Sequence, residues 1–324
     1  MGLVTMHYKS VCLLGGSGFV GKHIASRLTA KGYHVLILTS RASHCNELRV
    51  LPNLNIIEID IHNQSQLNTA TANVDMIINL VGILNEKQHN GDGFRRAHIQ
   101  LAHKIISACH YNKITRLIQM SALNADASHG ASHYLRTKGE AENLIHSFST
   151  DIDVTSFRPS VIFGTDDSFF NRFASILKLS PLIFPLACAQ AKFAPIHVEE
   201  VAEFFVDAIS NKASFGKRID LCGPETYTLK ELVCFTSQQI GRKHWIISLP
   251  DSISKLQANL LEYIPGKPFS VDNYNSLKVD SICHQRQLYT ARNTIQSIVP
   301  GYLGQKNKFY RDDQFRQHSR RNLL

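Results

Sequence analysis

A glycine-rich turn between a short apolar run and an amphipathic stretch constrains the fold of this 324-residue chain more than any other feature. The apolar run SVCLLGG ends in glycines, and FVGKHIASRLTAKG follows it with apolar residues at helical spacing up to Gly32. The pattern predicts a strand, a tight turn and a helix. Gly15, Gly18 and Gly21 stand in GxxGxxG spacing within that turn.

Each glycine of the turn has a physical reason to be there. Gly15 permits the tight turn, Gly18 lets a diphosphate approach the backbone, and Gly21 lets the helix pack closely on the strand. The diphosphate would then accept hydrogen bonds from the helix N-terminal amides. The turn therefore predicts a dinucleotide site, and we expect its intervening residues to border the cofactor as well: Ser17, Phe19 and Val20.

Apolar runs and helical stretches alternate along the first half of the chain. Strands are expected at 10–16, 34–40, 54–61, 74–82, 114–122 and 151–160, and helices at 19–32, 63–73, 93–111 and 133–149. No hairpin signals separate the strands, which favours a parallel sheet covered on both faces. The fold class predicted is α/β, a Rossmann-type doubly wound parallel sheet followed by a smaller, mostly helical C-terminal lobe.

The regular alternation ends near Gly164. Beyond it, helices are expected at 166–179, 197–210, 228–241 and 251–263, and strands at 216–223 and 243–250. We therefore predict a dinucleotide-binding domain at 1–164, with later segments returning to its sheet, a smaller substrate or partner lobe at 165–300, and a basic tail at 301–324.

The second strand indicates which dinucleotide is bound. An NAD site usually places an acidic residue at the end of this strand to hold the ribose 2′-hydroxyl. Here Thr39 and Ser40 occupy that end and Arg41 follows. Because a guanidinium with nearby hydroxyls suits a 2′-phosphate, NADP(H) is favoured over NAD(H).

The stretch SHYLRTKGEAE brings Tyr134 and Lys138 to one face of the predicted helix at 133–149, because residues four apart share a face. A phenol has an ordinary pKa near 10, so it needs an adjacent cation to act as a base near neutral pH. The spacing fits a catalytic pair, and it also fits a surface helix whose tyrosine packs on a neighbour.

Several motifs together resemble the extended and atypical short-chain dehydrogenase/reductase superfamily. They are the glycine turn, NLVG at 79–82, YLRTK, FRPSVIFG at 157–164 and PIHVEEVA at 195–202. More narrowly, RPSVIFGTDDSFFNRF, AKFAPIHVEEVA and PGKPFSVDNYNSLKVDSIC are similar to the bacterial relatives of the nucleotide-binding accessory subunit of respiratory complex I. The resemblance covers about residues 9–283.

The resemblance implies roles for individual residues. Tyr134 would be the general acid/base, while Lys138 would hold the nicotinamide ribose and lower the tyrosine pKa. Ser121 is the candidate for the hydroxyl that binds the substrate oxygen. The remaining cofactor-binding residues implied are Asp60 and Ile61 at the adenine, Asn79, Val81 and Gly82 along the central wall, and Pro159.

The sequence departs from the superfamily pattern at the third catalytic position. In the extended branch the hydroxyl lies about where Leu123 and Asn124 stand here, which leaves the role of Ser121 open. If active, the protein would be an NAD(P)H-dependent oxidoreductase linked to respiratory-chain or ubiquinone metabolism. The alternatives are a non-catalytic subunit stabilised by its cofactor and a nucleotide-sugar epimerase or dehydratase.

Charge and composition suggest further partners. The net charge of +9 favours anionic ligands, and part of it lies in the 301–324 tail, which suits a membrane complex or anionic surface. The apolar stretch LSPLIFPLACAQA at 179–191 reads as a hydrophobic loop and would suit a quinone-like molecule. No nucleic acid or metal is expected as a partner. The scattered cysteines favour free thiols in a reducing compartment. The location expected for the protein is therefore the cytoplasm, including the inner face of a membrane.

Overall fold

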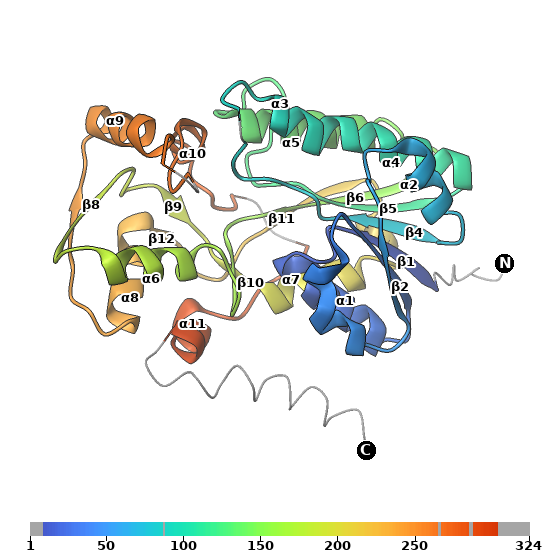
Figure 1. Cartoon of the computed structure of the whole chain (residues 1–324), viewed down its shortest axis with the longest axis horizontal. Helices are drawn as coiled ribbons and strands as arrows, with labels where there is room; N and C mark the ends of the chain where they lie inside the picture. The colour runs from blue at the N-terminus through green and yellow to red at the C-terminus, as the bar shows by residue number, and fades with distance from the viewer. Residues whose placement is uncertain (1–8, 87, 265–266, 285–287, 304–324) are drawn as a thin grey trace, which may run out of the picture. The chain divides into compact units, whose positions relative to one another are not determined.

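A seven-stranded parallel sheet forms the centre of the first of two compact units (Figure 1). In this computed structural model the described residues are 9–86, 88–264, 267–284 and 288–303. The first unit comprises Met1–Pro159, Val198–Leu221 and Cys283–Tyr289, and the second comprises Ser160–His197, Cys222–Ile282 and Thr290–Leu324. The basic tail predicted at 301–324 lies outside the described residues from 304 onward.

The strand order of the sheet is β11-β6-β5-β4-β1-β2-β3, and every pairing is parallel. The strands are β1 (Ser10–Leu14), β2 (His34–Thr39), β3 (Leu54–Glu58), β4 (Met76–Asn79), β5 (Arg116–Met120), β6 (Asp153–Pro159) and β11 (Lys217–Leu221). The predicted Rossmann-type fold is therefore confirmed. The order reverses between β1 and β4, and ligands of such sheets bind where the order reverses, outside the carboxyl ends of the strands.

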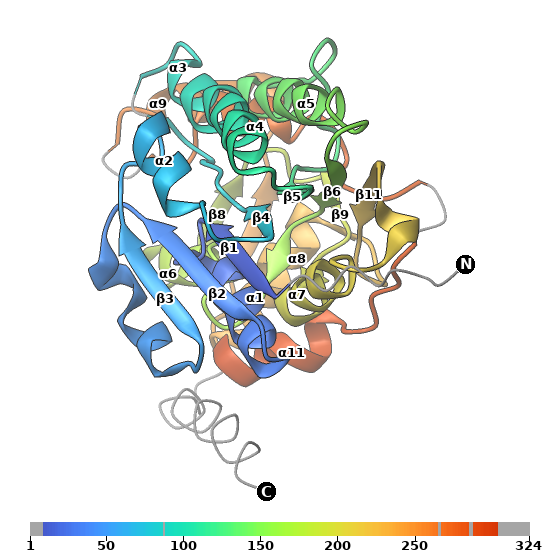
Figure 2. The ribbon, with the colours of Figure 1, turned by 90° about the vertical axis from the view of Figure 1, so that its right-hand side faces the viewer.

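Helices cover both faces of this sheet (Figure 2). One face carries α1 (Phe19–Ala30) and α7 (Val198–Asp207), and the other carries α2 (Gln64–Ala70), α4 (Leu101–Asn112) and α5 (His133–His146). The short helix α3 (Asp92–Arg95) continues through a π-helical turn, Arg96–Gln100, into α4. After β2, a 3₁₀ segment spans Ala42–Val50, and a second such turn spans Lys212–Ser214.

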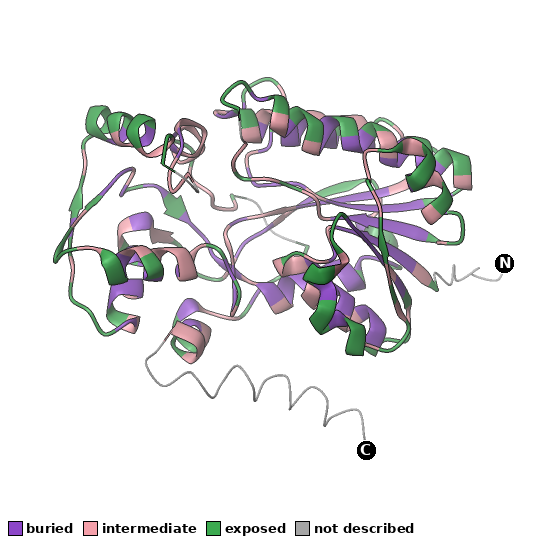
Figure 3. Cartoon of the chain, viewed as in Figure 1, coloured by how far each residue is buried: buried purple, intermediate pink, exposed green. Residues whose placement is uncertain are grey.

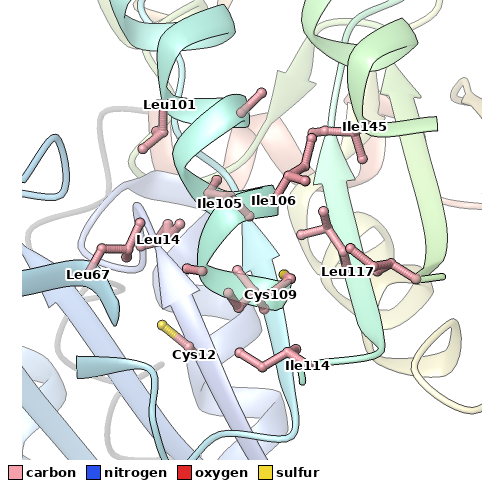
Figure 4. Packing of buried hydrophobic residues seen from close by; sticks show 14 of the residues in the cluster. Cys12, Leu14, Leu67, Leu101, Ile105, Ile106, Cys109, Ile114, Leu117 and Ile145 are labelled. Atoms are coloured by element: carbon pink, nitrogen blue, oxygen red, sulfur yellow. The ribbon is translucent and has the colours of Figure 1, made fainter. Parts of the chain in front are cut away.

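The core beneath α4 and α5 is aliphatic (Figure 4). Leu14 and Leu117 come from the sheet, while Ile105, Cys109 and Ile145 come from the helices, and all five are fully buried. The inner strands of a parallel sheet covered on both sides are mostly apolar, as in β1, β2 and β4, which is why the sequence signal for them was strong.

A fully buried arginine joins the returning segment to the sheet. Arg116, the first residue of β5, donates to the carbonyl oxygens of Ala208 at 2.7 Å and Ile209 at 3.3 Å, just after α7. It also donates to the Asp153 carbonyl at 2.7 Å and to Thr155 Oγ1 at 2.8 Å. Because buried carbonyls need donors, this side chain satisfies the end of α7 while crossing β5 and β6.

The packing of α1 on α7 includes a charged contact. Glu199 Oε1 lies 2.6 Å from His23 Nδ1, and its Oε2 accepts from Arg27 Nε at 2.9 Å. Burial acts to raise the pKa of the Glu199 carboxyl, but His23 and Arg27 outweigh it and lower that pKa to about 2.

The second unit combines five helices with small ladders of two strands each in its described part. The helices are α6 (Phe170–Leu179), α8 (Leu229–Gln239), α9 (Asp251–Leu261), α10 (Val271–Ser276) and α11 (Ile295–Leu303). The ladders pair β7 (Ile162–Phe163) with β10 (Ile196–His197), β9 (Lys192–Phe193) with β12 (Tyr227–Thr228), and β8 (Ile183–Leu186) with β13 (Trp245–Ser248). The helix expected at 228–241 is confirmed as α8, and Thr228 caps its start through a capping box with Glu231.

Three details differ from the sequence-based expectations. The stretch 179–191 was expected to be a loop, but it contains β8, which pairs in parallel with β13. Helix α11 runs through residue 300, the expected boundary of the tail. Cys222 and Cys283 are each disulfide-bonded, whereas free thiols were expected, because a scattered cysteine carries no local signal that it forms a disulfide. Among the described residues, no helix is both long and apolar enough to span a bilayer.

Candidate functional site

The glycine turn joins β1 to α1 at the reversal of strand order. Gly15 has φ +80°, a left-handed conformation that favours glycine, and its carbonyl accepts from Gly18 N at 3.0 Å. Gly18 is the N-cap residue of α1, and no side chain caps this end. The first amides of the twelve-residue helix are therefore available to an anionic ligand.

The other two glycines of the motif have different surroundings. A Cβ on Gly21 would lie 2.4 Å from the Gly15 carbonyl oxygen and 2.6 Å from Gly16 Cα, so helix and turn could not pack as they do. A Cβ on Gly18 would meet only the Gly15 oxygen, at 3.3 Å, and would otherwise project into open space. Gly21 is thus required by packing, whereas Gly18 leaves room above the turn.

The end of β2 lies next to β1, which leads into this turn, and β3 pairs with the far side of β2. Thr39 is buried and exchanges hydrogen bonds with the backbone of Arg41, whose side chain is exposed. The Glu58 carboxylate accepts from Ala42 N at 2.7 Å, so an acidic group stands one residue from Arg41. Cys45, which sequence reasoning missed, is buried here. Burial raises the pKa of its thiol. Hydrogen bonds with the Ser17 and Thr39 side chains lower that pKa, but burial has the larger effect.

Asp60 and Ile61 follow β3. Asp60 is exposed, and its Oδ1 accepts from His62 N at 2.9 Å, which fixes the turn into α2. Ile61 is half-buried and packs against the aliphatic core. Both residues stand beyond the carboxyl end of their strand, as an adenine-bordering pair would require.

The loop after β4 is held by a buried amide. Asn79 Nδ2 donates to Gln119 Oε1 at 2.7 Å, and Asn79 Oδ1 accepts from Val81 N at 3.1 Å. A Cβ on Gly15 would lie 3.2 Å from Val81 N, so this loop also borders the glycine turn. Asn79 therefore positions the segment that continues to Gly82.

Lys138 is buried on α5 and reaches the same loop. Its Nζ donates to the Val81 carbonyl at 3.3 Å and to the Met120 carbonyl at 3.0 Å. Burial lowers the pKa of its ammonium from 10.5 to about 8, and the Glu142 carboxylate opposes that shift. Glu142 is itself bound by Arg158 through bonds of 3.0, 3.0 and 2.6 Å, so little of its charge is left for Lys138.

Tyr134 lies one turn before Lys138 and is half-buried. Its ring packs edge-on against His98, with centroids 5.7 Å apart, and against Phe94 at 6.2 Å. The structure therefore brings Tyr134 and Lys138 to one side of α5. A tyrosine packed on its neighbours was the alternative interpretation of this spacing, and the ring contacts with His98 and Phe94 show such packing.

His98 is a further residue of this cluster that sequence reasoning did not find. It stands in the π-helical turn, where its Nδ1 lies 2.9 Å from Thr137 Oγ1 and its Nε2 accepts from Ile83 N at 3.4 Å. Burial, together with the Lys138 ammonium, lowers the pKa of His98 to about 2, so the ring is neutral. A single histidine inside a helical pattern carries no signal for this placement.

Ser121 follows β5 directly, next to the Met120 carbonyl that binds Lys138. Its side chain is 3 % exposed, and its Oγ has no hydrogen-bond partner among the described residues. Leu123, where the extended branch would carry its hydroxyl, is buried and donates its N–H to the Pro159 carbonyl at 3.2 Å. Ser121 and Pro159 thus lie at the carboxyl edge of neighbouring strands β5 and β6.

Four features lie at this edge of the first unit. They are the uncapped start of α1, the buried ammonium of Lys138, the phenol of Tyr134 and the hydroxyl of Ser121, which has no partner among the described residues. Such perturbed and unsatisfied groups gather at binding sites. Within the described ranges, no cluster of three or more His, Cys, Asp and Glu residues could hold a metal ion.

Comparison with known proteins identifies the family of this chain. The model of the NAD dependent epimerase/dehydratase family matches residues 11–222. The chain is 25% identical over 291 residues to the mitochondrial NADH dehydrogenase [ubiquinone] 1 alpha subcomplex subunit 9 of Arabidopsis thaliana, covering 85% of this chain and 71% of that protein. It is also 25% identical over 252 residues to the mitochondrial NADH-ubiquinone oxidoreductase 40 kDa subunit of Neurospora crassa, covering 77% and 65%.

Among solved structures, MoeE5 in complex with UDP-glucose and NAD is similar in fold. Its TM-score is 0.72 at 15% identity, and the match covers 97% of this chain and all of that one. At this identity the likeness concerns the fold alone.

Proposed function

Because this chain belongs to the NAD dependent epimerase/dehydratase family, we propose that its Gly15–Gly21 turn binds the pyrophosphate of a pyridine dinucleotide. The observation that carries the proposal is the uncapped start of α1, at the point where the strand order reverses. A pyrophosphate oxygen there would accept from backbone amides and benefit from the helix dipole. The space above Gly18 suits the close approach of such a group.

The nicotinamide end of the dinucleotide is proposed to lie further along the same edge of the sheet, near Lys138. Lys138 Nζ uses two donors on the Val81 and Met120 carbonyls, which leaves one N–H for a ribose hydroxyl. The ammonium also favours ionisation of a phenol near it. Tyr134, one turn away on α5, is proposed to give a proton to, or take one from, a substrate oxygen.

The dinucleotide, when bound, supplies or accepts the hydride, so the reaction class proposed is oxidation or reduction at a carbonyl or alcohol carbon. Ser121 is proposed to bind the substrate oxygen or the cofactor. What supports this role is its buried Oγ, which lacks a partner in the described part of the chain. A ligand oxygen within reach would remove the cost of that unsatisfied group.

NADP(H) is the dinucleotide proposed, through a charge-assisted bond from Arg41 to the 2′-phosphate. The exposed guanidinium beside Ser40 supports this preference. The Glu58 carboxylate acts against it, although one of its oxygens is already bound to Ala42 N. Arg41→Ala should then weaken NADPH binding about tenfold or more and leave NADH binding unchanged. Equal affinity of the parent protein for NADPH and NADH would refute the proposed preference for NADP(H).

A second candidate is a subunit stabilised by its cofactor without turnover, acting beside a quinone-dependent membrane complex. The two curated relatives favour it, because one is named as a subunit of NADH dehydrogenase [ubiquinone] and the other as a subunit of NADH-ubiquinone oxidoreductase. The buried charge of Lys138 favours it too, because a ligand that compensates this charge would stabilise the folded chain. A quinone-like substrate belongs to the first candidate, and a nucleotide-sugar reaction remains the weaker alternative, supported by fold likeness alone.

One preparation tests these proposals. The purified chain is extracted for bound nucleotide, which is identified by mass, and the emptied protein is titrated with NADPH and NADH by calorimetry. Gly18→Ala is expected to keep the thermal stability of the parent and to lose most of its dinucleotide affinity. No bound nucleotide and no heat with either dinucleotide would refute the proposed function.

Turnover is tested separately on a panel of carbonyl and quinone substrates. Tyr134→Phe should abolish oxidation of the dinucleotide while binding stays intact. The matched control is Tyr111→Phe, which changes an exposed tyrosine on α4. Full activity in Tyr134→Phe would exclude Tyr134 from the mechanism. Binding without turnover in the parent favours the second candidate.

A further inference from the structure

Exposed apolar side chains concentrate on one part of the second unit. Of the sixteen large apolar side chains that are exposed in the described ranges, ten lie between Leu179 and Ile264. Single exposed apolar residues are normal on protein surfaces, but a concentration of them marks an interaction site. Six of the ten lie on β8, β13 and α9, and the other four lie in adjoining segments: Leu179, Leu182, Tyr263 and Ile264. Helix α9 is coloured mainly green in Figure 3.

Helix α9 has its apolar side turned outward. Ile253, Leu256 and Leu260, spaced three and four residues apart, are 47%, 56% and 64% exposed. The residues it buries are the small Ser254 and Ala258. A surface helix normally buries its apolar stripe, so the arrangement in α9 is the reverse of the usual one.

The β8–β13 ladder exposes a second apolar strip. Its register places Trp245 opposite Ile183 and Ile247 opposite Pro185, and all four are exposed, whereas Ile246 between them is buried. Alternate residues of a strand point to opposite faces, so these four side chains share one face.

The stripe of α9 and the ladder are neighbours. Only Leu249 and Pro250 separate β13 from α9 in sequence, and Gln257 of α9 donates to the Pro185 carbonyl of β8 at 3.4 Å. Ser254 Oγ also donates to the Leu249 carbonyl at 3.3 Å. Together the α9 stripe and the outward face of the ladder are called the apolar surface below.

The charges beside the apolar surface indicate its occupant. Lys178, Arg242, Lys243 and Lys255 are exposed in the segments that form or flank it. The segments 176–184 and 241–249 contain no acidic residue. In α9, Asp251 accepts from the Tyr274 hydroxyl at 2.6 Å, so part of its charge is bound within the unit.

Outward leucines and isoleucines, exposed tryptophan and tyrosine, and flanking cations together match the chemistry of an anionic bilayer surface. Trp245 is 76% exposed and Tyr263, just beyond α9, is 81% exposed, and both aromatic types favour the headgroup region. We propose that the apolar surface binds the headgroup and acyl boundary of an anionic lipid bilayer, with α9 lying in the plane of the membrane.

Trp245 is the only tryptophan of the chain, so its fluorescence reports on this surface alone. The full-length protein is titrated with unilamellar vesicles of phosphatidylcholine, with and without phosphatidylglycerol. Sedimentation with the vesicles measures binding, and Trp245 emission, with quenching by brominated acyl chains, measures insertion. The expected result is sedimentation with the anionic vesicles, a blue shift of Trp245 emission and quenching by the brominated lipid.

Two double variants separate the apolar and charged contributions. Leu256→Ser with Leu260→Ser should abolish the Trp245 shift. Arg242→Gln with Lys243→Gln should weaken binding about thirty-fold, at roughly 1 kcal/mol per cation near an anionic surface. The matched control, Val50→Ser with Tyr111→Ser, changes two exposed apolar residues of the first unit and should bind as the parent does. Circular dichroism verifies that each variant is folded.

Three outcomes would overturn the proposal. Sedimentation without any change in Trp245 emission would assign membrane binding to another part of the chain, such as the basic tail. Unchanged binding by a folded Leu256/Leu260 variant would do the same. Concentration-dependent self-association that this variant abolishes, without vesicle binding by the parent, would assign the apolar surface to a second copy of the chain.

Discussion

Replacing Lys138 by methionine should change the stability of the dinucleotide-free protein in opposite directions at neutral and at alkaline pH. Lys138 is 3 % exposed, and burial lowers the pKa of its ammonium from 10.5 to about 8. That difference corresponds to about 3 kcal/mol of unfavourable free energy for keeping the charged form in the folded protein. The penalty is fully present below pH 8.

The sign follows from proton binding. Between pH 8 and 10.5 the unfolded chain keeps the lysine proton and the folded chain releases it, so the stability of the parent protein rises with pH in this window. Methionine removes both the charge and its titration. It also removes the two hydrogen bonds to the Val81 and Met120 carbonyls, which are worth about 1 kcal/mol each.

The balance predicts that Lys138→Met is about 1 kcal/mol more stable than the parent at pH 7 and about 1 kcal/mol less stable near pH 10. Urea unfolding of both proteins at the two pH values measures the difference. The control, Lys217→Met, changes an exposed lysine of the first unit and should show no crossover. A Lys138→Met variant that is less stable by the same amount at both pH values would refute the reasoning.

Three further predictions concern the first unit. Gly21→Ala should cost about 2 kcal/mol or more in urea unfolding, because its methyl would lie 2.4 Å from the Gly15 carbonyl oxygen; unchanged stability would show that the turn can shift freely. Arg116→Met should cost at least about 3 kcal/mol and speed hydrogen exchange at 208–221, since several buried carbonyls lose their donor. Glu199→Gln should flatten the acid dependence of stability: the depressed pKa of this carboxyl stabilises the fold above pH 4.5, an effect lost as pH falls through about 2.

The fold of the first unit could be predicted because its signals are local. The inner strands β1, β2 and β4 are nearly continuous apolar runs, and the turn after β1 carries its glycines at fixed spacing. By contrast, the pairing of β8 with β13 joins residues about sixty positions apart, and two-stranded ladders leave no periodicity of their own. The buried role of Arg116 also had no signal, because an arginine at the start of a strand is usually exposed.

The residues of the candidate site also divide into those that a local sequence pattern predicted and those that it did not. Tyr134 and Lys138 were found because spacing on one helix brings them together. His98 was missed because its position depends on a π-helical turn, which shifts the register of a helix without a recognisable sequence pattern. Cys45 was missed because it contacts Ser17 and Thr39 through the 3₁₀ segment after β2. That segment has no apolar periodicity from which it could be predicted.

A buried ammonium and a buried hydroxyl lie next to each other at the carboxyl end of β5. Both are energetically unfavourable, and together they argue for a ligand. Lys138 donates to the carbonyl of Met120, and the next residue, Ser121, buries a hydroxyl without a partner among the described residues. Either feature alone lowers stability, and an apolar residue at each position would pack there at less cost. A fold selected for stability alone would not keep both at the one edge where parallel sheets bind ligands. A ligand that supplies oxygen atoms to Lys138 and Ser121 would offset both costs, so binding there would stabilise the fold most strongly at neutral pH, where the ammonium is charged.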